Sequence, residues 1–160
     1  MKKVFKFVIT LLSGAALGFT LCKRFFKAAP KDDANDKVEK FKGYYNLLNQ
    51  WLTLKQEGKT LEQYFMDNQY KTVAIYGMGE LGKRLYDDLS GSAAVQIKYA
   101  LDKNAGEIYK DIDVKAIDEE LEEVDAIIVT ATFAFNEIAS NLSESFRCPI
   151  VSLEDIVFEV

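Results

Sequence analysis

The chain has 160 residues, of which 49% are hydrophobic; this suffices for one compact domain with an appendage and is not typical of disorder. The net charge of −5 hides a gradient: every charged side chain before Asp32 is basic, whereas acidic side chains crowd residues 118–125. The predicted globular part has no basic stripe, which disfavours nucleic-acid binding. Two distant cysteines and no histidine cannot supply the ligands of a zinc site, so we expect no metal, and catalysis by a histidine base is excluded.

An uncharged, apolar segment covers residues 7–22 (FVITLLSGAALGFTLC), and basic residues flank it on both sides. It is shorter than the roughly 20 residues of a spanning helix, but residues 4–6 extend it if Lys6 snorkels toward the headgroups. We predict an N-terminal membrane helix that anchors the chain at residues 1–27, with membrane contact through residues 4–27. A cleaved signal peptide and an interfacial helix are the alternatives, although a basic cluster stands where a signal peptide would have its cleavage site.

The cellular location of the globular part is predicted from function rather than from topology. Both flanks of the apolar segment are basic, so the positive-inside rule gives no orientation. We place the globular part in the cytoplasm because NAD and nucleotide sugars are found there. Cys22 lies in the apolar segment and Cys148 precedes a predicted buried strand, which makes a disulfide between them implausible and agrees with a reducing compartment.

Between the anchor and the main domain we predict a linker at residues 28–36 and a helical hairpin at residues 37–69. The linker is polar and contains a proline. Asp36, with Glu39 three residues later, marks the start of the first helix, and Gly58 marks its end.

Six apolar side chains of the first hairpin helix recur at steps of mainly three and four residues and define one apolar face. Its aromatic members suit base stacking, but packing on the sheet or on a second subunit is the favoured interpretation. We therefore expect residues 38–54 to contact the domain, a second copy or a partner enzyme. Thr60 with Gln63 forms a capping box that begins a short second helix. The six residues of the face are Val38, Phe41, Tyr45, Leu48, Trp51 and Leu52.

A glycine-rich turn is the main functional motif of the chain. Residues 72–76 are a short, apolar run typical of a strand buried on both faces, and a Gly-x-Gly-x-x-Gly motif leads from it into a predicted helix. The first glycine permits the tight turn, the second lets a pyrophosphate approach the backbone, and the third lets the helix pack closely. The helix N-terminus offers free N–H groups and a partial positive charge to the phosphate. The predicted nucleotide-binding residues of this turn are Gly77, Met78, Gly79, Glu80, Leu81 and Gly82.

A second predicted strand, residues 95–101, ends in Asp102, about 20 residues past the glycines. A carboxylate at this position binds the ribose hydroxyls and repels a 2′-phosphate, which favours NAD over NADP. The alternative is a solvated turn, because Asp102 and Lys103 precede an asparagine in good turn chemistry. Glu80 lies close to where a pyrophosphate would bind: either it complements the helix dipole, or it weakens anion binding.

Three further strands complete a five-stranded, Rossmann-like parallel sheet within the α/β domain at residues 70–160. Thr130, Ala131 and Thr132 follow the fourth strand, at the edge where sheets of this kind bind ligands. The two threonines either bind phosphate or sugar, or cap the next helix. The remaining elements are strands at residues 112–114, 126–130 and 150–151, an acidic helix at 118–122, and a helix containing Phe135, Ile138 and Leu142.

Four segments of the domain carry a family resemblance: they are residues 75–82 (IYGMGELG), 99–103 (YALDK), 125–130 (DAIIVT) and 149–153 (PIVSL). They resemble small bacterial Rossmann domains that bind NAD(P) or nucleotide sugars and occur alone or fused to sugar-modifying enzymes of surface-polysaccharide biosynthesis. Such domains are loosely described as nucleotide-sugar epimerase- or dehydratase-like. The resemblance implies the fold more than the reaction, because one fold hosts many functions.

We expect a membrane-anchored Rossmann module that binds NAD or a related nucleotide and senses, scaffolds or assists an envelope polysaccharide pathway. Independent catalysis is not expected, because the chain ends after five strands without a substrate domain. Tyr99 and Lys103 have the Tyr-x-x-x-Lys spacing of epimerases but straddle a strand end instead of lying on a helix. The alternatives are a small oxidoreductase or nucleotide-sugar-modifying enzyme active as an oligomer, and a degenerate Rossmann domain that binds only protein.

Overall fold

The computed structural model describes residues 33–102, 108–109 and 111–160. The predicted anchor at residues 1–27 and the first part of the predicted linker lie outside the described residues, as does Lys103. Among the residues that are described, no helix combines the length and the apolar character that crossing a membrane requires. Residues 40–160 form one compact unit.

A sheet with five parallel strands in the order β4-β2-β1-β5-β6 lies at the centre of this unit. The chain moves outward from β1 on one side of the sheet and then returns to build the other side, so the strand order reverses at β1. This is a Rossmann-like order, and the predicted α/β class with a five-stranded parallel sheet is confirmed. The strands are β1 (Thr72–Tyr76), β2 (Gln96–Leu101), β4 (Ile112–Lys115), β5 (Ala126–Val129) and β6 (Ile150–Ser152).

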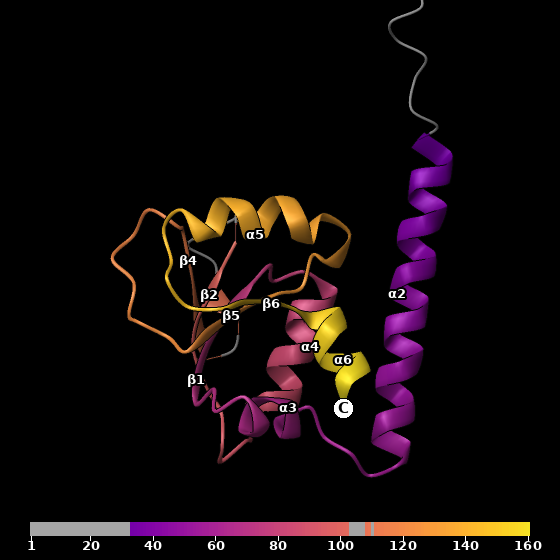
Figure 1. The fold of residues 1–160 in the computed structure, drawn as a ribbon, viewed down its shortest axis with the longest axis horizontal. Coiled ribbons are helices and arrows are strands. Elements are labelled where there is room, and N and C mark those ends of the chain that lie inside the picture. The colour runs from indigo at the N-terminus through magenta and orange to yellow at the C-terminus, as the bar shows by residue number, and fades with distance from the viewer. Residues whose placement is uncertain (1–32, 103–107, 110) are drawn as a thin grey trace, which may run out of the picture. The chain divides into compact units, whose positions relative to one another are not determined.

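Helices cover both faces of the sheet: α4 (Glu80–Leu89) and α6 (Leu153–Glu159) lie on one side, and α5 (Phe135–Ser143) lies on the other (Figure 1). Alternate residues of β1 pack on opposite faces of the sheet. Val73 and Ile75 pack with α4 and α6, whereas Ala74 packs in the cluster under α5. Strands buried on both faces have unbroken apolar sequences, as β1 and β5 do.

The segment between β4 and β5 differs from the prediction. The acidic helix expected at residues 118–122 is absent, and residues 116–125 cross the sheet as an irregular connection. Four of the five side chains at 118–122 are acidic, so a helix there would place like charges one turn apart and would have little apolar surface to bury.

A strand at the sheet edge and a helix after β6 were not predicted from the sequence. The short strand β3 (Ile108–Tyr109) pairs antiparallel with β4 at the outer edge of the sheet. The helix α6 ends the chain, and the Ser152 hydroxyl caps it by accepting a hydrogen bond from the Glu154 N–H at 3.2 Å.

The helical segment before the sheet begins earlier than predicted and ends as predicted. α2 (Asp33–Gln56) starts before the expected residue Asp36, so the last part of the predicted linker is helical. Gly58 ends the helix with φ 76°, and the Lys59 N–H donates to the Leu54 carbonyl at 2.9 Å. This is the left-handed glycine cap that satisfies the last carbonyls of a helix.

The short helix α3 (Glu62–Asp67) exists, but the predicted capping box that would begin it is wrong. Its N-cap is Leu61, which makes no side-chain capping bond. Thr60 therefore lies one residue before the cap position, and its backbone carbonyl instead accepts from the Gln63 N–H at 3.3 Å.

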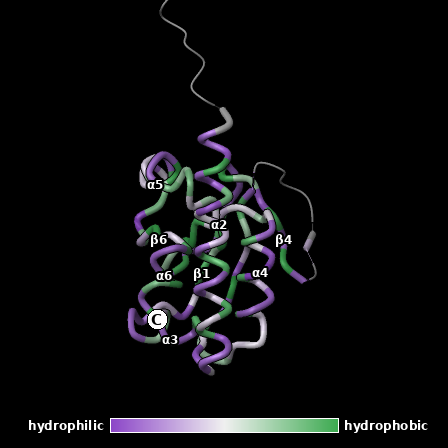
Figure 2. The backbone as a smooth tube through the Cα atoms, turned by 90° about the vertical axis from the view of Figure 1, so that its right-hand side faces the viewer, coloured by the Kyte–Doolittle hydropathy of each residue, from purple (hydrophilic) through white to green (hydrophobic). Residues whose placement is uncertain are grey.

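Of the apolar face predicted for α2, one residue packs on the domain. The side that packs on the domain consists of Leu47, Trp51 and Leu54 with half-buried Tyr44. Trp51 alone belongs to the predicted face, and its indole N–H donates to Asp88 of α4 at 3.1 Å. Figure 2 shows α2 running in front of the sheet between α6 and α4. The predicted face residues that are exposed instead are Val38, Phe41, Tyr45, Leu48 and Leu52.

Candidate functional site

The glycine-rich turn leaves β1 at the point where the strand order reverses. Gly77 has φ 96°, a conformation that side chains disfavour, so the tight turn predicted for the first glycine is confirmed. Its N–H donates to the Leu101 carbonyl at 2.7 Å, which ties the turn to the end of β2. In open parallel sheets, the crevice outside this reversal is where ligands bind.

Gly82 lets α4 approach the turn closely, as predicted for the third glycine. A Cβ atom at position 82 would lie 2.0 Å from the Gly77 carbonyl oxygen, so no side chain fits there. Thr130, at the end of β5, holds the same oxygen by donating its hydroxyl to it at 2.6 Å. The turn is therefore fixed from both α4 and β5.

Gly79 differs from the other two glycines of the turn because open space surrounds it. It is exposed, and an added Cβ would meet no atom within 4 Å. It is also the N-cap of α4, so the first N–H groups of that helix, which have no intrahelical acceptor, begin here. The arrangement leaves an anion room to approach the backbone and the positive end of the helix dipole.

Asp102 lies beside this turn, as the sequence spacing predicted. Its carboxylate accepts a hydrogen bond from the Met78 N–H at 2.7 Å, although the two residues are on different strand ends. Burial, and secondarily the Asp102 charge, raise the pKa of the Tyr76 phenol at the end of β1. Tyr76 is consequently protonated at neutral pH and can donate a hydrogen bond.

Glu80 points its charge along α4 and away from the helix end. Its carboxylate lies 3.9 Å from the Arg84 guanidinium, one turn further along, and its side chain is 82% exposed. An exposed pair at this distance is weak, so the carboxylate stays in solvent near the anion position without filling it.

Met78 and Leu81 contribute through the backbone only. Both side chains are buried in the core on the α4 side of the sheet. Their predicted role in binding is therefore limited to N–H groups, and the Met78 N–H is already bonded to Asp102.

The residues after β5 lie at the same edge of the sheet, but the helix-capping alternative for the two threonines is wrong. The N-cap positions are Ala131, before the 3₁₀ helix η1 (Thr132–Ala134), and Ala134, before α5. Thr130 is 4% exposed and bonded to the turn, so it supports the turn rather than touching solvent.

Thr132 lines an open cavity of about 740 Å³ at the carboxyl ends of β5 and β6. Three carboxylates face this cavity, from Glu137, Glu154 and Asp155. Phe133 also lines it, and the Lys40 ammonium of α2 lies 3.8 Å from the centre of the Phe133 ring.

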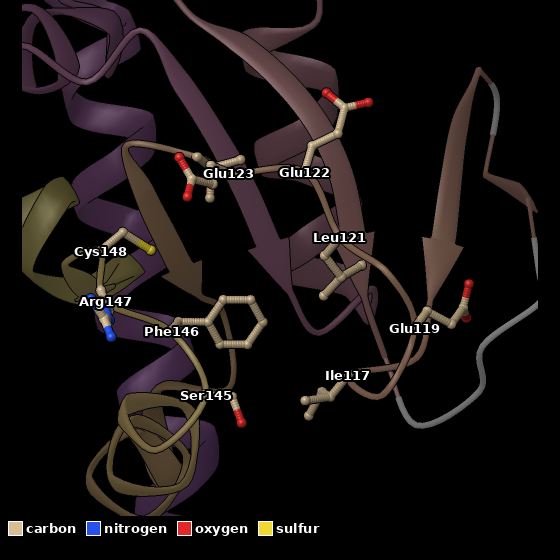
Figure 3. Close-up of a pocket in the computed structure, with 10 residues that line it drawn as sticks. Ile117, Glu119, Leu121, Glu122, Glu123, Ser145, Phe146, Arg147 and Cys148 are labelled. Atoms are coloured by element: carbon tan, nitrogen blue, oxygen red, sulfur yellow. The ribbon is translucent and has the colours of Figure 1, made fainter.

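A second cavity, of about 590 Å³, lies beside the irregular connection after β4 (Figure 3). Ile117 and Leu121 of that connection and Phe146 after α5 line it with apolar side chains. Cys148 also borders it, and burial raises the pKa of its thiol. The cavity was not predicted from the sequence, because a helix was expected in this connection.

Comparison of the chain with protein families, with curated proteins and with solved structures gave no match in any of the three. The class of the protein therefore follows from its own fold: a Rossmann-like parallel α/β domain with a glycine-rich turn at the reversal of its strand order.

Proposed function

We propose that the domain binds NAD or a related nucleotide at the glycine-rich turn. The observation that carries the proposal is the open backbone of Gly79 at the N-terminus of α4, with the Asp102 carboxylate hydrogen-bonded to the neighbouring Met78 N–H. One ligand with a phosphate and a ribose would meet both features at once. The phosphate would accept hydrogen bonds from the N–H groups of α4, and the ribose hydroxyls would donate hydrogen bonds to Asp102.

The cavity beside Thr132 suits the part of the ligand beyond the phosphates. Its carboxylates, including Glu154 and Asp155, favour a neutral polar group or a cation over a further phosphate. A sugar or a nicotinamide ring meets this condition. Asp102 would repel a 2′-phosphate in the same way, so NAD is favoured over NADP.

We propose a sensory, scaffolding or accessory role for the bound nucleotide, in an envelope polysaccharide pathway and with the domain held at the cytoplasmic side of a membrane by residues 1–27. Binding without turnover fits the groups near the turn. Tyr76 is held protonated by its raised pKa, which makes it a poor general base at neutral pH.

Gly79→Ala tests the site, because the added methyl group enters open space and leaves the fold unstrained. The full chain in detergent is heated with NAD, NADP, ATP or a UDP-sugar, and the shift of Tm is recorded. A ligand at 100 times its Kd stabilises a protein by about 2.7 kcal/mol, which is readily measured. We expect NAD or a UDP-sugar to raise Tm of the unsubstituted chain, and Gly79→Ala to lose that rise.

Gly91→Ala is the matched control, since an added Cβ there also meets nothing within 4 Å. It should keep the full ligand-induced shift. A shift that Gly79→Ala retains would place the nucleotide elsewhere, and no shift with any ligand would favour a domain that binds only protein.

A further inference from the structure

The part of α2 from Lys40 to Gln56 has two separate apolar stripes. One packs on the domain through residues such as Leu47 and Trp51. The other faces solvent, and its four side chains are large and exposed: Phe41 is 69% exposed, Tyr45 69%, Leu48 37% and Leu52 56%. We call these four residues the outer stripe. A stripe of this size on a helix that is already packed needs an explanation of its own.

The spacing of the outer stripe is that of a coiled-coil seam. Its members follow one another at steps of four, three and four residues, the alternation of a heptad repeat. The inner stripe has the same alternation, at Tyr44, Leu47, Trp51 and Leu54, and already covers the domain, so the outer stripe is left exposed for a second helix. Alternation of three and four keeps apolar side chains on one line, where they insert between the same residues of a like helix. We propose that the outer stripe pairs with the outer stripe of a second copy of this chain.

The area of the outer stripe is compatible with a specific but modest dimer. An aromatic side chain covers roughly 150–250 Å², so the exposed parts of Phe41 and Tyr45 with those of both leucines offer about 400 Å² per copy. Pairing two copies would remove about 800 Å² from water, before the flanking side chains are included, against the roughly 1,000 Å² that a specific interface needs.

The surroundings of the outer stripe favour a protein partner over a lipid surface. A shallow cavity of about 350 Å³ adjoins Leu48 and Leu52, and its polar lining includes Arg84, Asp87 and Asp88 of α4. Helices that lie in a membrane interface have basic residues around a broad apolar face. Here Lys55 and Arg84 balance Asp87 and Asp88 beside a narrow seam, so the cavity offers no net positive charge to an anionic lipid surface.

The orientation of the pair rests on the anchor proposed at residues 1–27. Two copies held in one membrane would have their α2 helices pointing the same way, and each outer-stripe residue would then meet its own equivalent. Holding both copies in one membrane also raises their effective concentration, which lets a small interface suffice. Binding of a nucleotide at Gly79 does not enter this inference.

Cysteine cross-linking of the full chain in lipid vesicles tests both the pairing and its direction. In a chain with Cys22→Ala and Cys148→Ala, Phe41→Cys and Leu52→Cys place single thiols at the two ends of the outer stripe. We expect each variant to form a disulfide dimer with itself on mild oxidation. Asn46→Cys is the control, because Asn46 is exposed on another side of α2 and should stay monomeric.

Cross-linking only between a Phe41→Cys chain and a Leu52→Cys chain would support pairing of the outer stripe but overturn the parallel direction. No cross-link at either position above the Asn46→Cys level would overturn the proposal. A second measurement is the molar mass by light scattering. Tyr45→Glu with Leu48→Glu should halve it, while Asn46→Glu should not. A dimer that survives the double change would also overturn the proposal, and the far-ultraviolet circular dichroism spectrum shows whether each variant is folded.

Discussion

The carboxylate of Asp102, at the end of β2, accepts a hydrogen bond from the backbone N–H of Met78, in the turn after β1, at 2.7 Å. The bond spans 24 residues of sequence and places a negative charge beside the proposed phosphate site. In dinucleotide-binding sites, a carboxylate in this position accepts a hydrogen bond from the ribose 2′-hydroxyl and repels a 2′-phosphate. Asp102 thus has both a structural and a selective role in the proposed site.

Asp102→Asn should change ligand preference more than stability. The amide oxygen still accepts from the Met78 N–H, but the charge that opposes a 2′-phosphate is lost. We expect the ratio of NADP affinity to NAD affinity to rise by about tenfold, the size of one charge-assisted hydrogen bond. Calorimetric titration with both dinucleotides measures the ratio. Asp113→Asn, on the exposed side of β4, is the control and should leave it unchanged. An unchanged ratio in Asp102→Asn would refute the ribose role.

Gly82→Ala should destabilise the domain strongly, because its Cβ would lie 2.0 Å from the Gly77 carbonyl oxygen and α4 would have to move. Overpacking against backbone costs about 3 kcal/mol or more. Urea unfolding followed by circular dichroism measures the loss. Gly43→Ala, on an open side of α2, should instead stabilise by about 0.5–1 kcal/mol, since alanine is the better helix former. Equal stabilities of the two variants would contradict the close approach of α4 to the turn.

Glu80→Gln should strengthen anion binding at the N-terminus of α4. Removing a charge near a helix end is worth about 0.3–1 kcal/mol, which corresponds to roughly two- to fivefold in the Kd of the nucleotide. Arg84→Gln should act in the opposite direction, because it removes a positive charge one turn from Glu80 and leaves that carboxylate unbalanced. Titrations of both variants at low salt show whether the Kd of the nucleotide shifts in opposite directions. Two shifts of the same sign would mean that Glu80 does not face the ligand.

The elements predicted correctly from the sequence are those whose local pattern is compatible with only one structure. A buried run followed by a Gly-x-Gly-x-x-Gly motif specifies strand, turn and helix, and the turn at Gly77 and the contact at Gly82 have the geometry expected. The partner of Thr130 was not predictable in the same way. Its hydroxyl bonds to a carbonyl 53 residues away, which depends on β5 lying next to β1.

The side of α2 that packs on the domain was unpredictable for a different reason. The helix carries two apolar stripes, and periodicity alone does not tell which stripe packs on the domain. The choice depends on contacts distant in sequence, among them Asp88 of α4, which accepts the Trp51 indole N–H. The helix that is missing at residues 118–122 shows the converse: a run of acidic residues specifies no element when only one of its side chains, Leu121, packs against the core.

Trp51→Ala and Leu52→Ala form a matched pair that tests this arrangement of α2. The two residues are neighbours, but Trp51 is 6% exposed and Leu52 is 56% exposed. Truncating a buried tryptophan costs about 3–5 kcal/mol, while an exposed leucine is worth well below that. We expect Trp51→Ala to lower the free energy of unfolding sharply and Leu52→Ala to leave it nearly unchanged at concentrations where the chain is monomeric. The reverse order would mean that the outer stripe packs on the domain.

Asp125 should make the domain sensitive to acid. It lies at the start of β5 and accepts hydrogen bonds from the N–H of Thr72 at 2.7 Å and from that of Lys71 at 2.9 Å, which joins β5 to the start of β1. Bonds from the Thr72 backbone and hydroxyl hold the pKa of Asp125 below its ordinary value of 3.8. Because the folded pKa is depressed, the stabilisation is complete above that ordinary value. It is lost as the pH falls from there through the folded pKa.

Asp125→Ala removes these bonds and tests the direction of this pH dependence. Asp125 is exposed, so we expect a loss of only about 1 kcal/mol at pH 7. The difference from the unsubstituted chain should shrink as the pH is lowered below 3.8, because protonation weakens the same bonds there. Urea unfolding at a series of pH values gives the free energy of unfolding of both chains as a function of pH. Asp113→Ala, which removes another exposed carboxylate, is the control and should follow the unsubstituted chain. A difference that persists unchanged into acid would show that the charge of Asp125 does not join the two strands.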